Sequence, residues 1–305
     1  MADFESAQHD ELLRLVARHA TTDGQTATVV PFLRLLRESH PTARRHGVIE
    51  PSLCAIVQGR KRMYVGAQTL NYVAPQYVMS VVEFPTSGHV MEATPRTPYL
   101  ALRLALDAGE IAQVIVDAKL DLATKPAANK PAVFVGRADA GLQSCLFRLV
   151  QLLDEPDHAQ FLAGDLRREI IYRLLRSEHG PEIYRTVQPS SLGVRRAVEW
   201  LRRHFDQPID IEALAKTCRM SVSSLRHEFK AATALAPLQF QKQLRLQEAR
   251  RLMLSGDVDA GSAAFRVGYE SPSQFSREYR RLYGAPPIRH VRGNQNSTVE
   301  PGVMQ

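Results

Sequence analysis

The pattern of apolar and polar positions changes along the chain, and the change predicts two kinds of structure. Between about residues 28 and 108, short apolar runs are separated by Pro, Gly and Asn. This pattern predicts short β-strands joined by turns, as in a sandwich or barrel. The expected strands are Leu53–Val57, Arg62–Val65, Tyr77–Phe84, His89–Ala93 and Tyr99–Leu106.

Helical spacing begins after Asp107. We expect helices over residues 110–118, 140–154 and 164–177, with a loop at 123–132. In the second of these helices, leucines recur at steps of four, three and four, which forms one apolar stripe. The stripe is either domain core or a dimer seam, and we favour the dimer. Its members are Leu142, Leu146, Leu149 and Leu153.

Length and composition limit the class of protein. A chain of 305 residues predicts two domains. A segment rich in Gly, Pro and Ser at residues 179–191 is the expected linker between them. No apolar run reaches about 18 residues, and the N-terminus lacks the pattern of a secretory signal, so we expect a cytoplasmic protein without a membrane span. Cys54, Cys145 and Cys218 are too widely spaced for a metal site or a disulfide framework.

The last third of the chain repeats itself at an offset of 50 residues. Each copy has a short helix, a tight turn and a second helix, which is the plan of a helix-turn-helix unit. We place the first unit at about residues 211–233 and the second at about 260–283. The matching pairs are Ser221 with Ser271, Ser223 with Ser273, Glu228 with Glu278, Phe229 with Tyr279, Lys230 with Arg280, and Pro237 with Pro287.

Local signals support both units. Asp210, Ser221 and Ser271 are suitable helix N-caps, and Gly268 can supply the positive φ of a tight turn. A helix over residues 237–254 separates the two copies and would be roughly 26 Å long. A rod of that length could present two helices to successive major grooves of one DNA face, which lie about 34 Å apart.

The basic charge is concentrated in the same region. Residues 191–293 contain 18 Lys and Arg against 10 Asp and Glu, whereas the remainder contains 21 against 22. Most of the cations are Arg, whose planar fork suits phosphates and guanine edges. A basic domain beside a neutral one indicates a polyanionic partner.

The polar positions of each second helix are the candidate DNA contacts. An ordinary solvated helix face is the alternative interpretation, and the repetition of caps, turns and charge argues against it. An RNA-binding or purely architectural protein is a further alternative, although RNA modules usually expose aromatic side chains on a sheet. The expected base contacts are Ser223, Ser224, Arg226, His227, Ser273, Gln274 and Arg277. The expected backbone contacts are Ser221, Lys230, Ser271, Ser276, Arg280 and Arg281.

Two stretches of the helical region resemble a known family. SAAFRVGYESPSQFSREYRRLYGAPP at residues 262–287 is similar to the signature of AraC/XylS-type transcription regulators. LAKTCRMSVSSLRHEFK, at residues 214–230, resembles the first helix-turn-helix of that family. The resemblance covers about residues 193–293 and implies an all-α DNA-binding domain that recognises promoter sequences.

The N-terminal half resembles the effector-sensing module of the same family. The resemblance covers residues 28–118 and implies a cupin-like barrel, so the expected fold class is α+β. It also implies that residues 119–190 form a helical linker and dimerisation segment. The matching residues are Glu50-Pro51-Ser52-Leu53-Cys54, Gln58-Gly59-Arg60-Lys61, Tyr77, Ser80, Thr94-Pro95 and Pro98-Tyr99-Leu100-Ala101.

Two positions depart from the family pattern. Arg219 stands where the first turn usually has Gly, and Ala234 stands where Gly usually ends the following helix. Since a non-glycine residue at positive φ is strained, the first unit has either a different turn or weaker DNA contacts.

Catalysis is not expected. Cupin oxygenases hold a metal with clustered His and a carboxylate, whereas His40, His46 and His89 show no such spacing. No metal or other cofactor is therefore predicted. Cys54 is interpreted as a core residue. An electrophile or redox sensor is the alternative, if Arg60, Lys61 and Arg62 lower its pKa.

Together these features predict a sequence-specific DNA-binding transcription regulator, controlled by a small molecule in its N-terminal domain. The expected partners are double-stranded promoter DNA, RNA polymerase, an unidentified effector and a second copy of the chain. The sequence leaves open the effector, the operator, and whether the outcome is activation or repression.

Overall fold

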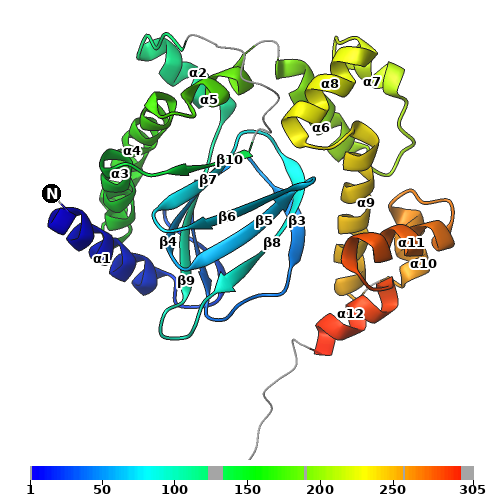
Figure 1. Ribbon diagram of the computed structural model, residues 1–305, viewed down its shortest axis with the longest axis horizontal. Helices are drawn as coiled ribbons and strands as arrows, with labels where there is room; N and C mark the ends of the chain where they lie inside the picture. The colour runs from blue at the N-terminus through cyan, green and yellow to red at the C-terminus, as the bar shows by residue number, and fades with distance from the viewer. Residues whose placement is uncertain (1, 123–132, 189–190, 257, 297–305) are drawn as a thin grey trace, which may run out of the picture. The chain divides into compact units, whose positions relative to one another are not determined.

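The computed structural model of the protein describes residues 2–122, 133–188, 191–256 and 258–296 (Figure 1). It divides into two compact units, Met1–Arg195 together with Glu228–Ala234, and Arg196–His227 together with Leu235–Gln305. The loop expected at 123–132 lies outside the described residues. Among the helices that the structure describes, none is long and apolar enough to cross a membrane.

The N-terminal unit contains two antiparallel sheets. The first has the strand order β1-β2-β9-β4-β7-β10 and the second has the order β3-β8-β5-β6. The six strands of the first are β1 (Gly24–Ala27), β2 (Leu33–Glu38), β4 (Ser52–Gln58), β7 (Gln76–Ser80), β9 (Tyr99–Ala105) and β10 (Val133–Arg137). The four of the second are β3 (Arg45–Ile49), β5 (Arg60–Val65), β6 (Gln68–Val73) and β8 (Phe84–Glu92). The expected β-rich domain is confirmed, with its strands in two open sheets in place of one closed barrel.

Each apolar run predicted as a strand overlaps an observed one, but one run was predicted too long. The run Tyr77–Phe84 is interrupted after β7, where the buried Ser80 hydroxyl donates a hydrogen bond to the Val82 carbonyl oxygen at 2.6 Å. Strands β1, β2, β3, β6 and β10 were not predicted. Their charged and polar residues obscure the alternation, as in β6, whose sequence is QTLNYV.

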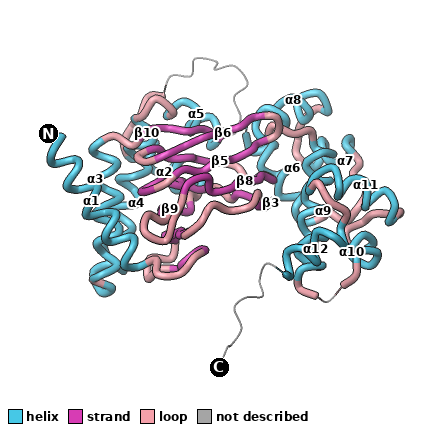
Figure 2. Tube along the Cα trace, turned by 60° about the horizontal axis from the view of Figure 1, so that its bottom comes forward, coloured by secondary structure: helices cyan, strands magenta, loops and turns pink. Residues whose placement is uncertain are grey.

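In the described part of this unit, helices α1 to α5 accompany the sheets (Figure 2). They are α1 (Ala2–His19), α2 (Ala108–Asp117), α3 (Ala140–Gln151), α4 (Pro156–Arg176) and α5 (Gly180–Val187), and a 3-10 turn, Leu152–Asp154, follows α3. Helix α1 was not predicted. It buries Leu12, Leu15 and Val16 and packs against α3, β4 and β9.

The leucine stripe lies in the core of the N-terminal unit. Leu149 has no exposed surface, and Leu142, Leu146 and Leu153 are also buried. Helix α3 packs against α1 and α4 (Figure 1). The prediction that the stripe forms a dimer seam is therefore wrong, because its side chains are already covered by their own domain.

The segment predicted as a linker contains helix α5 instead. It packs against α2 and α4, and Ile183 is buried. The Gly180-Pro181 pair, which suggested a break, occupies the first turn of the helix, where proline is tolerated because its missing N–H would have no partner.

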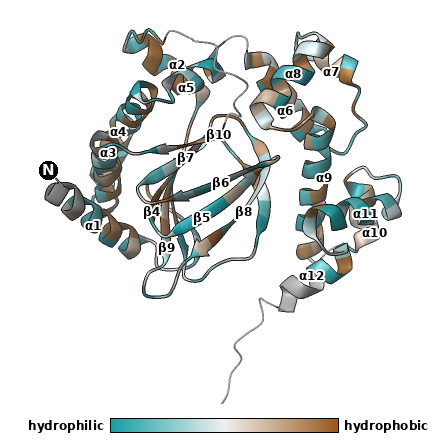
Figure 3. Ribbon diagram, in the orientation of Figure 1, coloured by the Kyte–Doolittle hydropathy of each residue, from teal (hydrophilic) through white to brown (hydrophobic). Residues whose placement is uncertain are grey.

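The second unit is helical throughout its described residues. Its elements are α6 (Leu192–Arg203), α7 (Ile211–Thr217), α8 (Val222–Thr233), α9 (Pro237–Leu254), α10 (Ala260–Arg266), α11 (Pro272–Tyr283) and α12 (Pro287–Asn296), although α6 and α8 each cross the division between units. Helix α9 has the bounds expected from the sequence and contacts α10, α11 and α12. In Figure 3 these helices carry both apolar and polar residues, as partly exposed helices do.

A core substitution tests the assignment of the leucine stripe. Leu149→Ala should destabilise the N-terminal unit by about 2–5 kcal/mol, because the deletion leaves a cavity among packed side chains. Amide hydrogen exchange in α3 measures the change. The control is Phe161→Ala on α4, where the side chain is 81% exposed and the change should stay within about 0.5 kcal/mol. If Leu149→Ala left exchange unchanged and weakened only self-association, the stripe would be a seam after all.

Candidate nucleic-acid interface and ligand cavity

The first helix-turn-helix, α7 and α8, is fixed by two caps and a tight turn. The Asp210 carboxylate accepts hydrogen bonds from the backbone N–H groups of Glu212 and Ala213 at 2.9 and 3.1 Å. In the turn, the Met220 N–H donates to the Ala215 carbonyl oxygen at 2.9 Å. The Ser221 hydroxyl then caps α8. These bonds satisfy backbone groups that helix ends leave without partners.

The second helix-turn-helix, α10 and α11, repeats the same devices. Asp259 caps α10 by accepting from the Ser262 N–H at 2.7 Å, a role that was not predicted. The Tyr269 N–H donates to the Ala264 carbonyl oxygen at 3.0 Å, and Ser271 caps α11. The first helices and turns of the two units thus match at an offset of 49. The second helices match at 50, because Glu270 adds one residue before the cap.

Arg219 and Ala234, the two residues that depart from the family pattern, both have the positive φ that is typical of glycine. Arg219 has φ +57° and Ala234 has φ +60°, whereas the corresponding Gly268 and Gly284 have +85° and +79°. The alternative of a different first turn is therefore wrong: the turn is kept, and two non-glycine residues occupy the left-handed region at some cost in strain. Weaker DNA contacts by the first unit stay a prediction.

The two second helices separate apolar from polar side chains. Leu225 and Phe229 of α8 and Phe275 and Tyr279 of α11 are fully buried. Of the thirteen predicted DNA contacts, three are half-buried, namely Ser224, Ser271 and Ser276. The others are exposed: Ser221, Ser223, Arg226, His227, Lys230, Ser273, Gln274, Arg277, Arg280 and Arg281.

One carboxylate ties α11 to its neighbours, which the sequence did not predict. The Glu278 carboxylate accepts from Lys242 of α9 at 2.8 Å, from the Tyr269 hydroxyl at 2.9 Å and from Gln274 at 3.2 Å. Burial acts to raise the pKa of Glu278. The hydrogen bonds lower it by more, so the pKa lies below the ordinary value. The side chain of Gln274, an expected base contact, is thereby oriented from within the protein.

Arg245 of α9 joins three segments of the helical unit. Its guanidinium donates to the carbonyl oxygens of Phe205 and Gly268, both at 2.6 Å, and of Gln207 at 2.8 Å. Gln241, one turn earlier, also donates to Gln207, at 2.7 Å. The chain after α6 and the turn of the second helix-turn-helix are therefore held by one side chain. This role was not predicted, because the partners are backbone oxygens far away in the sequence.

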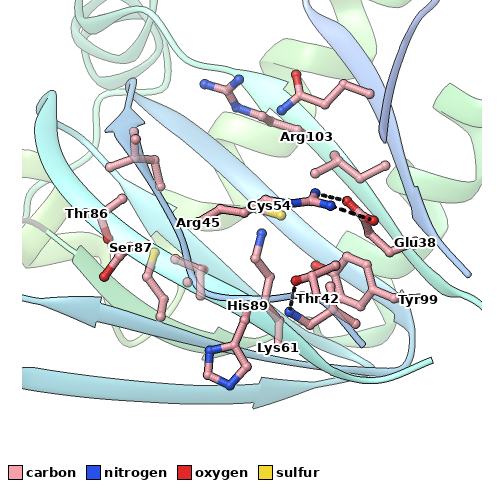
Figure 4. A pocket seen from close by; sticks show the side chains of 18 of the residues that line it. Glu38, Thr42, Arg45, Cys54, Lys61, Thr86, Ser87, His89, Tyr99 and Arg103 are labelled. Atoms are coloured by element: carbon pink, nitrogen blue, oxygen red, sulfur yellow. Dashed lines mark hydrogen bonds and ion pairs between the residues drawn. The ribbon is translucent and has the colours of Figure 1, made fainter. Parts of the chain in front are cut away.

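The N-terminal unit contains a cavity of about 310 Å³ between its two sheets (Figure 4). Although β3 and β8 contribute consecutive residues to its lining, several strands face it with alternate residues, as the two-residue period of a strand requires. On β5 these are Lys61 and Met63, and on β9 they are Tyr99 and Arg103. Further walls come from Leu36, Glu38, Arg45, Val48, Cys54, Tyr72, Val78 and Val90. The volume lies at the lower end of the range of about 300–1,000 Å³ that is typical of ligand pockets.

Cys54 lies in the wall of this cavity. It is only 8% exposed, and burial raises its pKa, although Lys61 and Arg103 act in the opposite direction. Of the three cations expected to activate it, Arg60 and Arg62 do not line the cavity. A buried, neutral thiol agrees with the interpretation of Cys54 as a core residue, and its environment does not favour the redox hypothesis.

His46 and His89 line the same cavity, although they are far apart in the sequence. The His89 ring points away from the centre of the cavity in Figure 4 and stacks on Tyr64. Among the residues that the structure describes, no group of three or more His, Cys, Asp or Glu side chains is arranged to hold a metal ion.

Comparison with known proteins establishes the family. The model described as the N-terminus of AraC-type transcriptional regulators matches residues 29–182, half of the chain. The chain belongs to the AraC-type transcriptional regulators. A second model, described as a helix-turn-helix domain, matches residues 214–292, which include the second unit of this AraC-type regulator and all but the start of the first. The family is one of regulators, so the cavity is a candidate binding site.

The individual relatives have low sequence identity to this chain. The HTH-type transcriptional activator RhaS of Escherichia fergusonii is 26% identical over 154 residues, which cover 50% of this chain and 55% of the relative. The match thus spans about half the length of the curated relatives. Apo ToxT K231A of Vibrio cholerae shares the fold, with a TM-score of 0.54 and 11% identity over 88% of this chain and 98% of ToxT. ToxT with a bound unsaturated fatty acid gives a TM-score of 0.51 and 10% identity over 88% and 97%.

Gly268 and Gly256 have similar φ, so alanine substitutions at the two positions distinguish a steric clash from backbone strain. At Gly268, a Cβ would lie 1.9 Å from the Asp206 carbonyl oxygen, whereas at Gly256, with φ +83°, it would meet nothing within 4 Å. Gly268→Ala should therefore cost about 2–5 kcal/mol, and Gly256→Ala only about 1–2 kcal/mol. Urea unfolding followed by the fluorescence of Trp200 reports the helical unit, since it is the one tryptophan of the chain. Equal losses would contradict the close approach at Gly268.

Relief of strain in the first turn should stabilise the helical unit. Arg219→Gly is expected to raise the free energy of unfolding by about 0.5–1 kcal/mol, because glycine adopts positive φ without a steric penalty. The same Trp200 fluorescence assay measures it. Arg219→Ala is the control: it removes the side chain, keeps the Cβ, and should give no gain. A gain from alanine would assign the effect to the arginine side chain.

Proposed function

We propose that this AraC-type regulator is a transcriptional activator that binds promoter DNA through α8 and α11 under the control of a small molecule in its N-terminal unit. The observation that carries the proposal is the repeated helix-turn-helix, in which two exposed, cationic helices have matching caps and turns. RhaS, the relative described above, is named as a transcriptional activator, which supports activation.

The outward side chains of α8 and α11 suit the two kinds of DNA contact. Arg226 and Arg277 can pair with the O6 and N7 atoms of guanine, and Gln274 with adenine. Lys230, Arg280 and Arg281 lie farther along their helices, where they would contact phosphates. Small serines at the start of each helix allow its backbone to approach the base edges.

Helix α9 supports binding to one face of the duplex. Its 18 residues span about 27 Å, and it lies in the chain between the two units. The Arg245 and Lys242 contacts attach the second unit to this rod. A fixed attachment favours contact with successive major grooves, about 34 Å apart.

Effector control is assigned to the cavity between the sheets. A ligand bound there would shift the population of arrangements in which DNA or RNA polymerase is contacted. ToxT has been solved with an unsaturated fatty acid bound, so a protein of this fold can accept a small molecule. We further propose that the regulator acts in the cytoplasm as a homodimer, through a surface other than the buried leucine stripe.

Two substitutions distinguish base contacts from phosphate contacts. Arg277→Ala should relax base choice at one operator position at a cost of about 1–3 kcal/mol. Lys230→Ala should weaken binding evenly across sequences and reduce the slope of log K against log salt by about one unit. The measurement is fluorescence anisotropy on operators obtained by selection from random DNA. A uniform loss from Arg277→Ala would make it a phosphate contact.

Competition separates this function from the alternatives. Labelled selected DNA is displaced with unlabelled operator, random duplex and RNA. Displacement by the operator at concentrations at least about a thousandfold lower than by random duplex supports sequence-specific promoter binding. Equal displacement by all three would indicate an architectural or RNA-binding protein.

A further inference from the structure

The cavity between the sheets has apolar walls and also charged side chains, most of them cationic. Its lining includes three cations, Arg45, Lys61 and Arg103, and one carboxylate, Glu38. Arg45 forms an ion pair with Glu38, and Arg103 forms one with Glu50 at 3.0 Å. Two of the three cations are therefore already neutralised by protein carboxylates.

Lys61 differs from the other two. Within the described part of the chain, no carboxylate lies within ion-pair distance of its ammonium, whose nearest ring is Tyr99, at 5.8 Å from the centroid. Figure 4 shows the side chain extending into the cavity toward Cys54. The surrounding walls include the buried side chains of Met63, Tyr72 and Val78. An ammonium facing such walls gains stability from an anion that occupies the space.

Neutral hydrogen-bond donors lie near this ammonium. The Tyr99 hydroxyl is buried without a well-formed hydrogen bond among the described residues, and Tyr99 is only 1% exposed. The Cys54 thiol is adjacent to it. Burial raises the pKa of both groups, so both keep their protons and can donate. A cation with neighbouring uncharged donors is suited to a carboxylate, which only accepts hydrogen bonds.

We propose that the cavity binds a small organic acid with an apolar body, whose carboxylate pairs with Lys61 and accepts a hydrogen bond from Tyr99. The inference rests on the proposed function only in identifying this cavity as the effector site. The apolar part of the acid lies against Met63, Tyr72 and Val78. A volume of about 310 Å³ suits an acid with a single ring or a short chain.

The test uses the full-length protein and pairs of probes with the same shape, one with a carboxylate and the other with a neutral amide. Benzoate, cinnamate, hexanoate and octanoate are each compared with the corresponding primary amide by isothermal titration calorimetry. At least one acid should bind, and its amide should bind about 10- to 100-fold more weakly, as expected for the loss of one charge-assisted pair.

Substitutions on strand β5 locate the charge. Lys61→Met should reduce the affinity for the acid about 10- to 100-fold, and Lys61→Arg should retain most of it. Arg62→Met is the matched control, because it removes a cation from the same strand at a position that does not line the cavity. It should change affinity less than twofold. Circular dichroism and hydrogen exchange of each variant test whether it is folded, so that a loss of affinity is not confused with unfolding.

Three outcomes would overturn the inference. The first is equal binding of an acid and its amide, and the second is undiminished binding of the acid by a folded Lys61→Met variant. The third is that none of the acids binds the wild-type protein at millimolar concentration, whether or not a neutral polyol such as a hexose does.

Parallel DNA-binding assays keep this inference apart from the proposed function. If an acid binds through Lys61 but leaves operator affinity and transcription unchanged, the ligand class stands and effector control by this cavity fails. If no acid binds while the protein still recognises a selected operator, DNA binding stands and the ligand class fails.

Discussion

The helical unit depends on the attachment of its second helix-turn-helix to helix α9, and Arg245 is the centre of that attachment. One guanidinium satisfies carbonyl oxygens from the segment after α6 and from the turn before α11. Buried backbone carbonyls without partners are costly, so removing this side chain would affect two segments at once. The close approach of Asp206 to Gly268 belongs to the same junction and explains why a side chain there has no room.

The helical half was largely predictable from the sequence, because its determinants are local. Caps such as Asp210 and Ser271, and a glycine at a left-handed turn, act within a few residues and leave a pattern in the chain. The bounds of α9 followed from Pro237 in the same way. Asp259 escaped notice because the repeat was aligned at a single offset, whereas the extra Glu270 requires two.

The N-terminal half was less predictable because its determinants are distant in the sequence. Strands such as β2 and β6 are identified by the strands with which they pair, because their own sequences contain too many polar residues to show the alternation. The leucine stripe was interpreted as a dimer seam in preference to a core, because α1, the helix that covers it, was not predicted. Likewise, strand alternation places Lys61 and Arg62 on opposite faces of β5. Only the packing of the two sheets shows that the face of Lys61 lines a cavity.

Glu278 gives the two DNA-binding units different responses to acid. A glutamate whose folded pKa lies below the ordinary value, about 4.3, contributes stability above that value and loses it as the pH falls through the folded pKa. Protonation would weaken the hydrogen bonds from Lys242, Tyr269 and Gln274 together, and with them part of the contact between α11 and α9. Glu228, the matching residue of α8, makes no such set of side-chain hydrogen bonds with the residues that the structure describes. A pH low enough to protonate Glu278 therefore loosens the second recognition helix through hydrogen bonds that the first helix lacks among the described residues.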